Sequence, residues 1–124
     1  MDDLVQFLRD RLDEDEQAAR RVKSSWRQIG ETGVIVASDG ERAEECANGN
    51  WTGIAEHIVR HDPARIMAEV EAKRRILRAH EKWCEGRCEA KYPEGGFDAA
   101  HFWSIKSLAT VYADHPDYRD TWRP

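Results

Sequence analysis

The stretch that decides the fold reads DPARIMAEVEAKRRIL and occupies residues 62–77. Asp62 belongs to the residue types that cap helix N-termini, and proline is favoured at the first helical position behind it. Apolar side chains then recur at helical spacing at Ile66, Val70 and Leu77. Glu71 and Arg75 stand four residues apart in the favourable order. The pattern predicts a long, charged, amphipathic helix.

Upstream of this helix the sequence predicts a short helix and a β-hairpin. Residues 52–61 carry apolar side chains at helical spacing. Residues 32–47 combine the β-branched run Gly33–Ala37 with Asp39-Gly40, a dipeptide typical of hairpin turns. The return strand, Arg42–Cys46, is polar and is therefore expected at an edge of the sheet.

The N-terminal segment, residues 3–28, predicts another helix. Asp3 is its expected cap, with Gln6 three residues on as a variant of the capping box. The expected buried side chains recur at helical spacing: Leu4, Leu8, Leu12, Ala19, Val22 and Trp26.

The C-terminal third begins with an irregular segment, residues 84–97, because the run YPEGG at residues 92–96 does not suit a helix. Asp98 is expected to cap a last helix that ends near residues 114–117. Tyr118 and Trp122 are expected to dock the tail onto the body of the protein. Together these segments predict a single α+β domain over residues 1–124, mainly helical, with a small antiparallel β-hairpin sheet packed on long helices.

Composition and charge exclude several classes of protein. Charged residues make up 35% of the chain and hydrophobic residues 40%. The longest apolar run, Gly33–Ala37, is far shorter than the roughly 20 residues of a spanning helix, so we expect no membrane insertion. The formal net charge of −5 argues against a nucleic-acid partner, whose phosphates require a basic surface. The first residues show no secretory signal, and the predicted location is the cytoplasm.

Three segments resemble a family of small uncharacterised proteins from actinobacteria and their phages. They are DDLVxFLxxRLxEDEQAA at residues 2–19, HDPARxxxEVEAKRRIL at residues 61–77 and YADHPDYRxxW at residues 112–122. The resemblance covers roughly half of the chain and implies a cytoplasmic protein of phage or prophage origin. It implies no activity, because the function of that family is unknown.

One group of residues has the chemistry of a metal site. His80, Cys84 and Cys88 stand at intervals of four, so a helix that continued this far would place all three on one face. His101 is the expected fourth ligand, at the start of the last helix. Two thiolates and two imidazoles are a typical ligand set for structural zinc. Members of the resembling family often carry cysteines in this region, although the spacing here departs from a Cys-x-x-Cys knuckle.

Two other interpretations of these residues stay open. The cysteines can be ordinary small buried residues, with His80 and His101 at the surface or at helix caps. Cys84 and Cys88 can also form a redox-active dithiol, although their spacing is not that of thioredoxin.

The sequence leaves three hypotheses for function. The leading one is a small non-enzymatic protein that binds another protein, with a homodimer as one form of that binding; it depends on the acidic balance, the small size and the charged helices. The second is a zinc-stabilised module built on His80, Cys84, Cys88 and His101. The third is a small enzyme with Asp114, His115 and His61 as its polar groups. His57 and His61 stand four apart, but not in the order of a metalloprotease motif.

Overall fold

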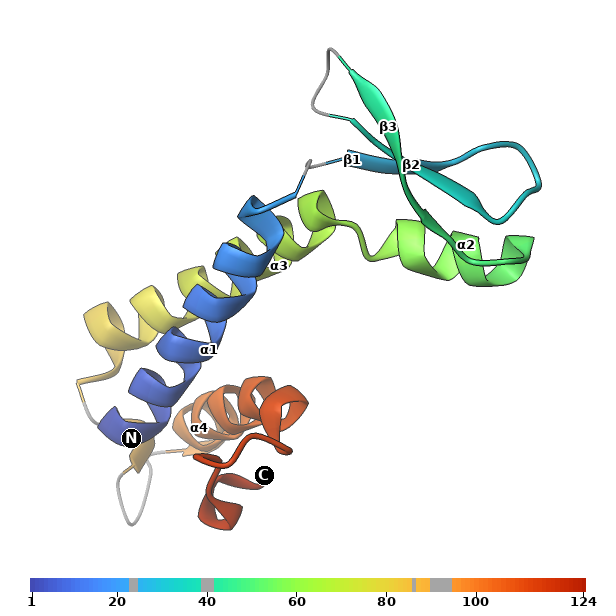
Figure 1. Ribbon diagram of the computed structural model, residues 1–124. Coiled ribbons are helices and arrows are strands. Elements are labelled where there is room, and N and C mark those ends of the chain that lie inside the picture. Colours follow the sequence, from blue (N-terminus) through green and yellow to red (C-terminus); the bar gives the residue numbers. More distant parts are fainter. Residues whose placement is uncertain (23–24, 39–41, 86, 90–94) are drawn as a thin grey trace. The chain divides into compact units, whose positions relative to one another are not determined.

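The protein is mainly helical, with one small sheet (Figure 1). The structure, a computed structural model, describes residues 1–22, 25–38, 42–85, 87–89 and 95–124. Its elements are α1 (Asp2–Arg20), β1 (Ser25–Gln28), β2 (Val34–Ser38), β3 (Ala43–Asn48), α2 (Thr52–Arg60), α3 (Pro63–Ala79) and α4 (Gly95–Ala109). Short turns of π- and 3-10 helix follow α3 and α4. The predicted α+β class is confirmed. Among the described residues, no helix has the length and apolar character needed to cross a membrane.

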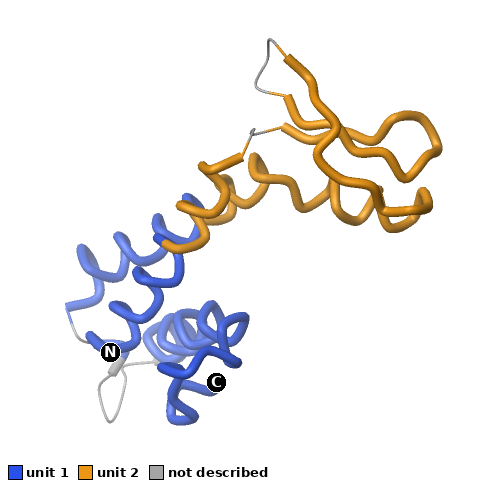
Figure 2. Tube along the Cα trace, viewed as in Figure 1, with its two compact units in different colours: residues 1–13, 71–124 blue, residues 14–70 orange. Residues whose placement is uncertain are grey.

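The chain divides into two compact units, which Figure 2 draws in different colours. Unit 1 comprises residues 1–13 and 71–124, and unit 2 comprises residues 14–70. The boundary falls inside α1 and inside α3, so each of these helices contributes residues to both units.

Unit 2 contains the sheet, in the order β1-β2-β3 with both pairs antiparallel. The central strand β2 buries Ile35 and Ala37. Nearly every residue of β3 is exposed, as the predicted polar edge strand requires. The helix α2 lies against β1 and β2 and buries Ala55. The predicted hairpin turn includes residues 39–41, which lie outside the described residues.

The prediction of one helix over residues 3–28 is wrong in its last third. The helix α1 ends at Arg20, and Trp26 lies in β1 opposite Ala37. The Trp26 backbone N–H donates a hydrogen bond to Asp62 Oδ2 at 3.1 Å. This partner is 36 residues away in sequence, so the helical spacing of Trp26 could not reveal it.

The start of α3 confirms the prediction made from Asp62 and Pro63. Asp62 Oδ1 accepts a hydrogen bond from the Arg65 backbone N–H at 3.0 Å, and Pro63 is the first helical residue. At the start of α1 the predicted cap is wrong. The helix begins at Asp2, and the Asp3 carboxylate instead accepts a hydrogen bond from Arg119 at 3.0 Å.

Unit 1 is built around the first half of α1. The core side chains of this unit come from three helices: Leu4, Leu8 and Leu12 of α1, Leu77 of α3, and Ile105 and Ala109 of α4. Ion pairs join α1 to α3 and to the turn behind it, Arg74 with Asp13 at 2.7 Å and Arg9 with Glu81. The predicted docking of the tail is confirmed, because the Tyr118 and Trp122 rings pack on Phe7 with centroids 5.9 and 5.1 Å away.

Within the described residues, parts of the segment 84–97 that was predicted to be irregular are helical. A π-helical turn occupies His80–Cys84 and a 3-10 turn occupies Arg87–Glu89. The helix α4 begins at Gly95, so Asp98 lies inside its first turn and the predicted cap is wrong. Gly95 and Gly96 are the first two residues of α4, and Ile105 and Ala109 anchor the helix in the core of unit 1. Tyr92, Pro93 and Glu94 lie outside the described residues.

Candidate metal centre

The four residues predicted to bind metal come together in unit 1. His80 and Cys84 lie at the two ends of the π-helical turn behind α3, Cys88 lies in the following 3-10 turn, and His101 extends from α4. One ligand atom from each residue lies within 4.8 Å of the others. Three successive segments of backbone therefore converge on one point.

The chain reaches this arrangement by leaving the helix and not by continuing it. Glu85 ends the π-helical turn in the left-handed conformation, with φ of 51°. The turn that follows brings the Cys88 backbone N–H to 3.3 Å from Cys84 Sγ, to which it donates a hydrogen bond. The expectation that one helical face holds His80, Cys84 and Cys88 is therefore wrong for Cys88, although the predicted set of residues does converge.

The two imidazoles face each other through their nitrogens. His80 Nδ1 and His101 Nε2 are 3.0 Å apart, and the rings are stacked with centroids 5.2 Å apart and an angle of 23° between their planes. At this separation one nitrogen donates its N–H in a hydrogen bond and the other accepts that bond. A cation between the rings and the sulfurs would instead take the lone pairs of both nitrogens.

The sulfurs provide the buried side of the cluster. Cys84 and Cys88 are only 6% and 2% exposed, and neither forms a disulfide. In a tetrahedral zinc site with bonds of about 2.0–2.3 Å, neighbouring ligand atoms lie about 3.3–3.8 Å apart. Shifts on the order of 1 Å would bring atoms that lie within 4.8 Å of one another to these separations. The donor set, the burial of the two sulfurs and the N–H···S hydrogen bond to Cys84 Sγ all suit a zinc–thiolate centre.

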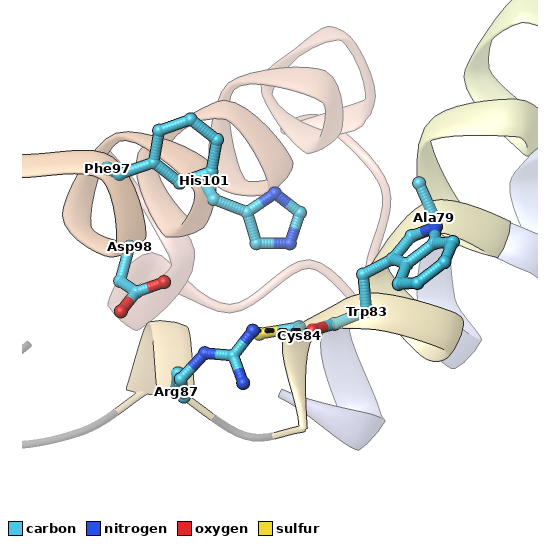
Figure 3. Close-up of a pocket in the computed structure, with 7 residues that line it drawn as sticks. All are labelled: Ala79, Trp83, Cys84, Arg87, Phe97, Asp98 and His101. Carbon is cyan, nitrogen blue, oxygen red and sulfur yellow. Dashed lines mark hydrogen bonds between the residues drawn. The ribbon is translucent and has the colours of Figure 1, made fainter.

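A hollow of about 340 Å³ opens beside the cluster (Figure 3). Cys84 and His101 form part of its wall, and the other lining residues are Ala79, Trp83, Arg87, Phe97 and Asp98. Trp83 and Phe97 are 65% and 85% exposed. Arg87 is held at the rim, because its guanidinium donates hydrogen bonds to the Trp83 carbonyl at 2.7 Å and to Glu85 at 3.2 Å.

Several residues of this hollow could not be predicted from the sequence. Phe97 and Arg87 come from the segment that was predicted to be irregular, and no periodic pattern marks either residue. Phe97 was excluded from the last helix because that helix was expected to start at Asp98. Only the convergence of two turns and α4 places these side chains on one hollow.

The polar groups of the enzyme hypothesis have structural partners in their own units. His115 Nδ1 lies 3.0 Å from a guanidinium nitrogen of the buried Arg11, and it accepts a hydrogen bond from the Asp117 backbone N–H at 3.0 Å. Asp114 is exposed. In unit 2, His61 Nδ1 lies 2.7 Å from the His57 carbonyl oxygen, and both rings are at the surface. These contacts give His115 and His61 roles in local structure.

The comparisons with known proteins identify a family without an activity. A family model described as a family of unknown function, DUF6221, matches residues 1–124. The chain therefore belongs to that family. No match was found among curated proteins or among solved structures.

Proposed function

We propose that this member of DUF6221 is a small zinc-stabilised protein that acts without catalysis, by binding another protein. Its zinc would be held by His80, Cys84, Cys88 and His101. The observation that carries the proposal is the convergence of these four donor atoms within 4.8 Å, from two turns and a separate helix.

The ligand set favours a structural ion. Zinc with two thiolates and two imidazoles is four-coordinate and keeps no position for water or substrate, whereas catalytic zinc usually has three protein ligands. The ion would supply bonds that join the end of α3 to α4, at a place where Cys84 and Cys88 are the buried groups of the connecting turns. A domain of this size buries few apolar side chains, so a metal ion that links two segments adds substantially to its stability.

The chemistry of the thiols supports a cytoplasmic location. Zinc binds cysteine as thiolate, and a reducing compartment keeps cysteines from pairing as disulfides. None of the three cysteines, all in the described part of the chain, forms a disulfide. The three sequence segments that resemble actinobacterial and phage proteins support an accessory role of the kind that small phage proteins perform.

The surface around the cluster supports protein binding. Trp83 and Phe97 expose large apolar rings, and Arg87 and Asp98 add one charge of each sign beside them. Exposed aromatic and arginine side chains are enriched among residues that dominate protein interfaces. The zinc would hold the segments that present this surface.

The metal part of the proposal is tested by elemental mass spectrometry of protein purified without a histidine tag and without added zinc. We expect about one zinc per chain, lost in Cys84→Ser/Cys88→Ser and in His101→Ala. Cys46→Ser is the matched control, because Cys46 is an exposed strand residue of unit 2, and it should keep the ion. A chain that holds no zinc, or a Cys46→Ser variant that loses it, would contradict the assignment.

The binding part is tested by affinity capture from host lysate with the zinc-loaded protein. We expect a specific partner that is retained by wild type and by Trp51→Ala, and lost by Trp83→Ala/Phe97→Ala. Trp51 serves as control because it is 64% exposed and lies in unit 2. Capture of nothing above the background of a blank resin would refute the interaction role.

A further inference from the structure

The outward face of α4 is unusual for this chain because its central row carries no charge, with the part-buried Lys106 beside it. Its central row consists of residues four apart: Ala99, Trp103, Ser107 and, in the turn after α4, Val111. Trp103 and Val111 are 59% and 67% exposed. Flanking residues Ala100, Ser104 and Thr110 are also exposed and uncharged. In a chain with 35% charged residues, an exposed uncharged row of this kind indicates a surface that contacts another molecule.

The hydroxyl groups on this face are already hydrogen-bonded within the helix. Ser104 Oγ donates to the Ala100 carbonyl at 2.8 Å, and Ser107 Oγ donates to the Trp103 carbonyl at 2.8 Å. Thr110 Oγ1 donates to the Ser107 carbonyl at 2.7 Å. Covering the face therefore leaves no hydroxyl donor without an acceptor, which removes the usual penalty for burying serine and threonine.

The order of side-chain sizes along the row indicates which molecule fits against it. From Ala99 to Val111 the row reads small, large, small, large. A second copy of the same row, running in the opposite direction, reads large, small, large, small. Trp103 of one copy then meets Ser107 of the other, and Val111 meets Ala99. A parallel copy in register would oppose Trp103 to Trp103 and leave the alanines facing a gap.

We infer that the outward face of α4 binds a second copy of this chain, with the two α4 helices antiparallel about a two-fold axis near the level of Ile105. Charge supports this occupant as well. Two chains of net charge −5 repel each other, and a contact through this uncharged row adds no further repulsion between like charges. Antiparallel helices also oppose their dipoles favourably.

This inference deepens the interaction role proposed above and does not depend on zinc. It assigns the α4 face to self-association and leaves the hollow beside the metal cluster to a different partner. Different variants test the two surfaces: Trp103→Glu tests the α4 face, and Trp83→Ala/Phe97→Ala tests the hollow.

The first experiment measures the mass of the zinc-loaded protein by sedimentation over a range of micromolar concentrations. We expect the mass of two chains for wild type, and a dissociation constant more than about tenfold weaker for Trp103→Glu, because the change buries a carboxylate in the contact. The control is Trp51→Glu, at a tryptophan of similar exposure, 64%, which should stay dimeric. Equal zinc content and melting temperature show that each variant is folded.

The second experiment tests the direction of the two helices. Chains with Ala99→Cys and chains with Val111→Cys, both in a Cys46→Ser background, are mixed and treated with a short bismaleimide. Antiparallel pairing predicts cross-links that join position 99 of one chain to position 111 of the other. Links between two copies of position 99 should be rare, because 12 residues of helix separate these positions by about 18 Å along the axis.

Three results would overturn the inference: a single-chain mass for wild type at all concentrations, an unchanged dimer in Trp103→Glu, or a predominance of links between two copies of position 99. A monomer that still captures a partner through Trp83 and Phe97 would refute self-association and leave the proposed function standing. A dimer that captures nothing would refute the hollow as a partner site and leave the α4 contact standing.

Discussion

The sulfur atoms of the three cysteines lie in different surroundings. Cys84 and Cys88 are buried beside two imidazoles, whereas Cys46 is exposed in β3, at the position where the register with β2 shifts. Partial desolvation of the Cys46 thiol, together with the neighbouring Glu45 carboxylate, raises its pKa above the ordinary value. A metal at Cys84 and Cys88 would bind both residues as thiolates.

We predict that iodoacetamide modifies one cysteine per chain in the zinc-loaded protein and all three after chelation in denaturant. The fast site should be Cys46, and its rate should rise as pH increases from 7 to 9, because a raised pKa leaves most of the thiol protonated at neutral pH. Peptide mapping by mass spectrometry gives the order of modification. Cys84 or Cys88 reacting as fast as Cys46 before chelation would be inconsistent with bound thiolates.

At the scale of the element, Asp62 serves two segments at once. Its Oδ1 caps α3 through the Arg65 N–H, and its Oδ2 accepts the Trp26 N–H of β1. We expect Asp62→Ala to lower the free energy of unfolding by about 1–3 kcal/mol, since a helix cap and a hydrogen bond to a charged group are both lost. Asp62→Asn keeps one oxygen acceptor and should lose less. Urea denaturation of the three proteins checks the order, and equal losses for both variants would disprove the double role.

Glu85 is the residue that turns the chain toward Cys88. Its φ of 51° lies in the left-handed region, which glycine adopts freely and β-branched residues strongly resist. We predict that Glu85→Gly keeps zinc and stability, whereas Glu85→Val loses about 1–2 kcal/mol and weakens zinc binding. Glu85→Gln is the control for the lost ion pair with Arg87. Calorimetry with metal titration measures both effects, and a valine variant equal to the glutamine variant would show that this conformation is not required.

The same elements show how far the sequence could predict the structure. Asp62, Pro63 and the apolar spacing behind them act within one helix, so local rules were sufficient for α3. Trp26 fits the helical spacing of α1, but it pairs with Ala37 and donates a hydrogen bond to Asp62. Both partners are distant in sequence, so a local pattern could not predict these contacts. The members of the His80, Cys84, Cys88 and His101 cluster were predictable as residue types with suitable spacing. The left-handed Glu85 and the early start of α4 were not, because both depend on how α4 packs in unit 1.

At the scale of the whole molecule, all four proposed zinc ligands lie in unit 1 and the sheet lies in unit 2. Zinc removal should therefore destabilise unit 1 more than unit 2. At free zinc a thousandfold above its dissociation constant, binding contributes about 4 kcal/mol, which chelation would remove. We predict that amides in residues 80–85 and 97–109 lose hydrogen-exchange protection, while the Val36 amide of the central strand retains most of its own.

Hydrogen exchange followed by mass spectrometry, with and without a chelator, measures this difference. The double variant Cys84→Ser/Cys88→Ser provides the control, because chelator should change nothing in it. Uniform loss of protection across both units would mean that the ion stabilises the chain as one cooperative whole. No loss anywhere would mean that the ion contributes no stability.

The most direct test of the central claim is X-ray absorption at the zinc edge of the purified, untagged protein. We predict four zinc ligands, two sulfurs at about 2.3 Å from the zinc and two imidazole nitrogens at about 2.0 Å from it. In Cys84→Ser/Cys88→Ser the sulfur shell should disappear, and in Cys46→Ser it should be unchanged. A wild-type spectrum without sulfur, or one in which Cys46→Ser removes the sulfur, would contradict the assignment of His80, Cys84, Cys88 and His101 as a structural zinc centre.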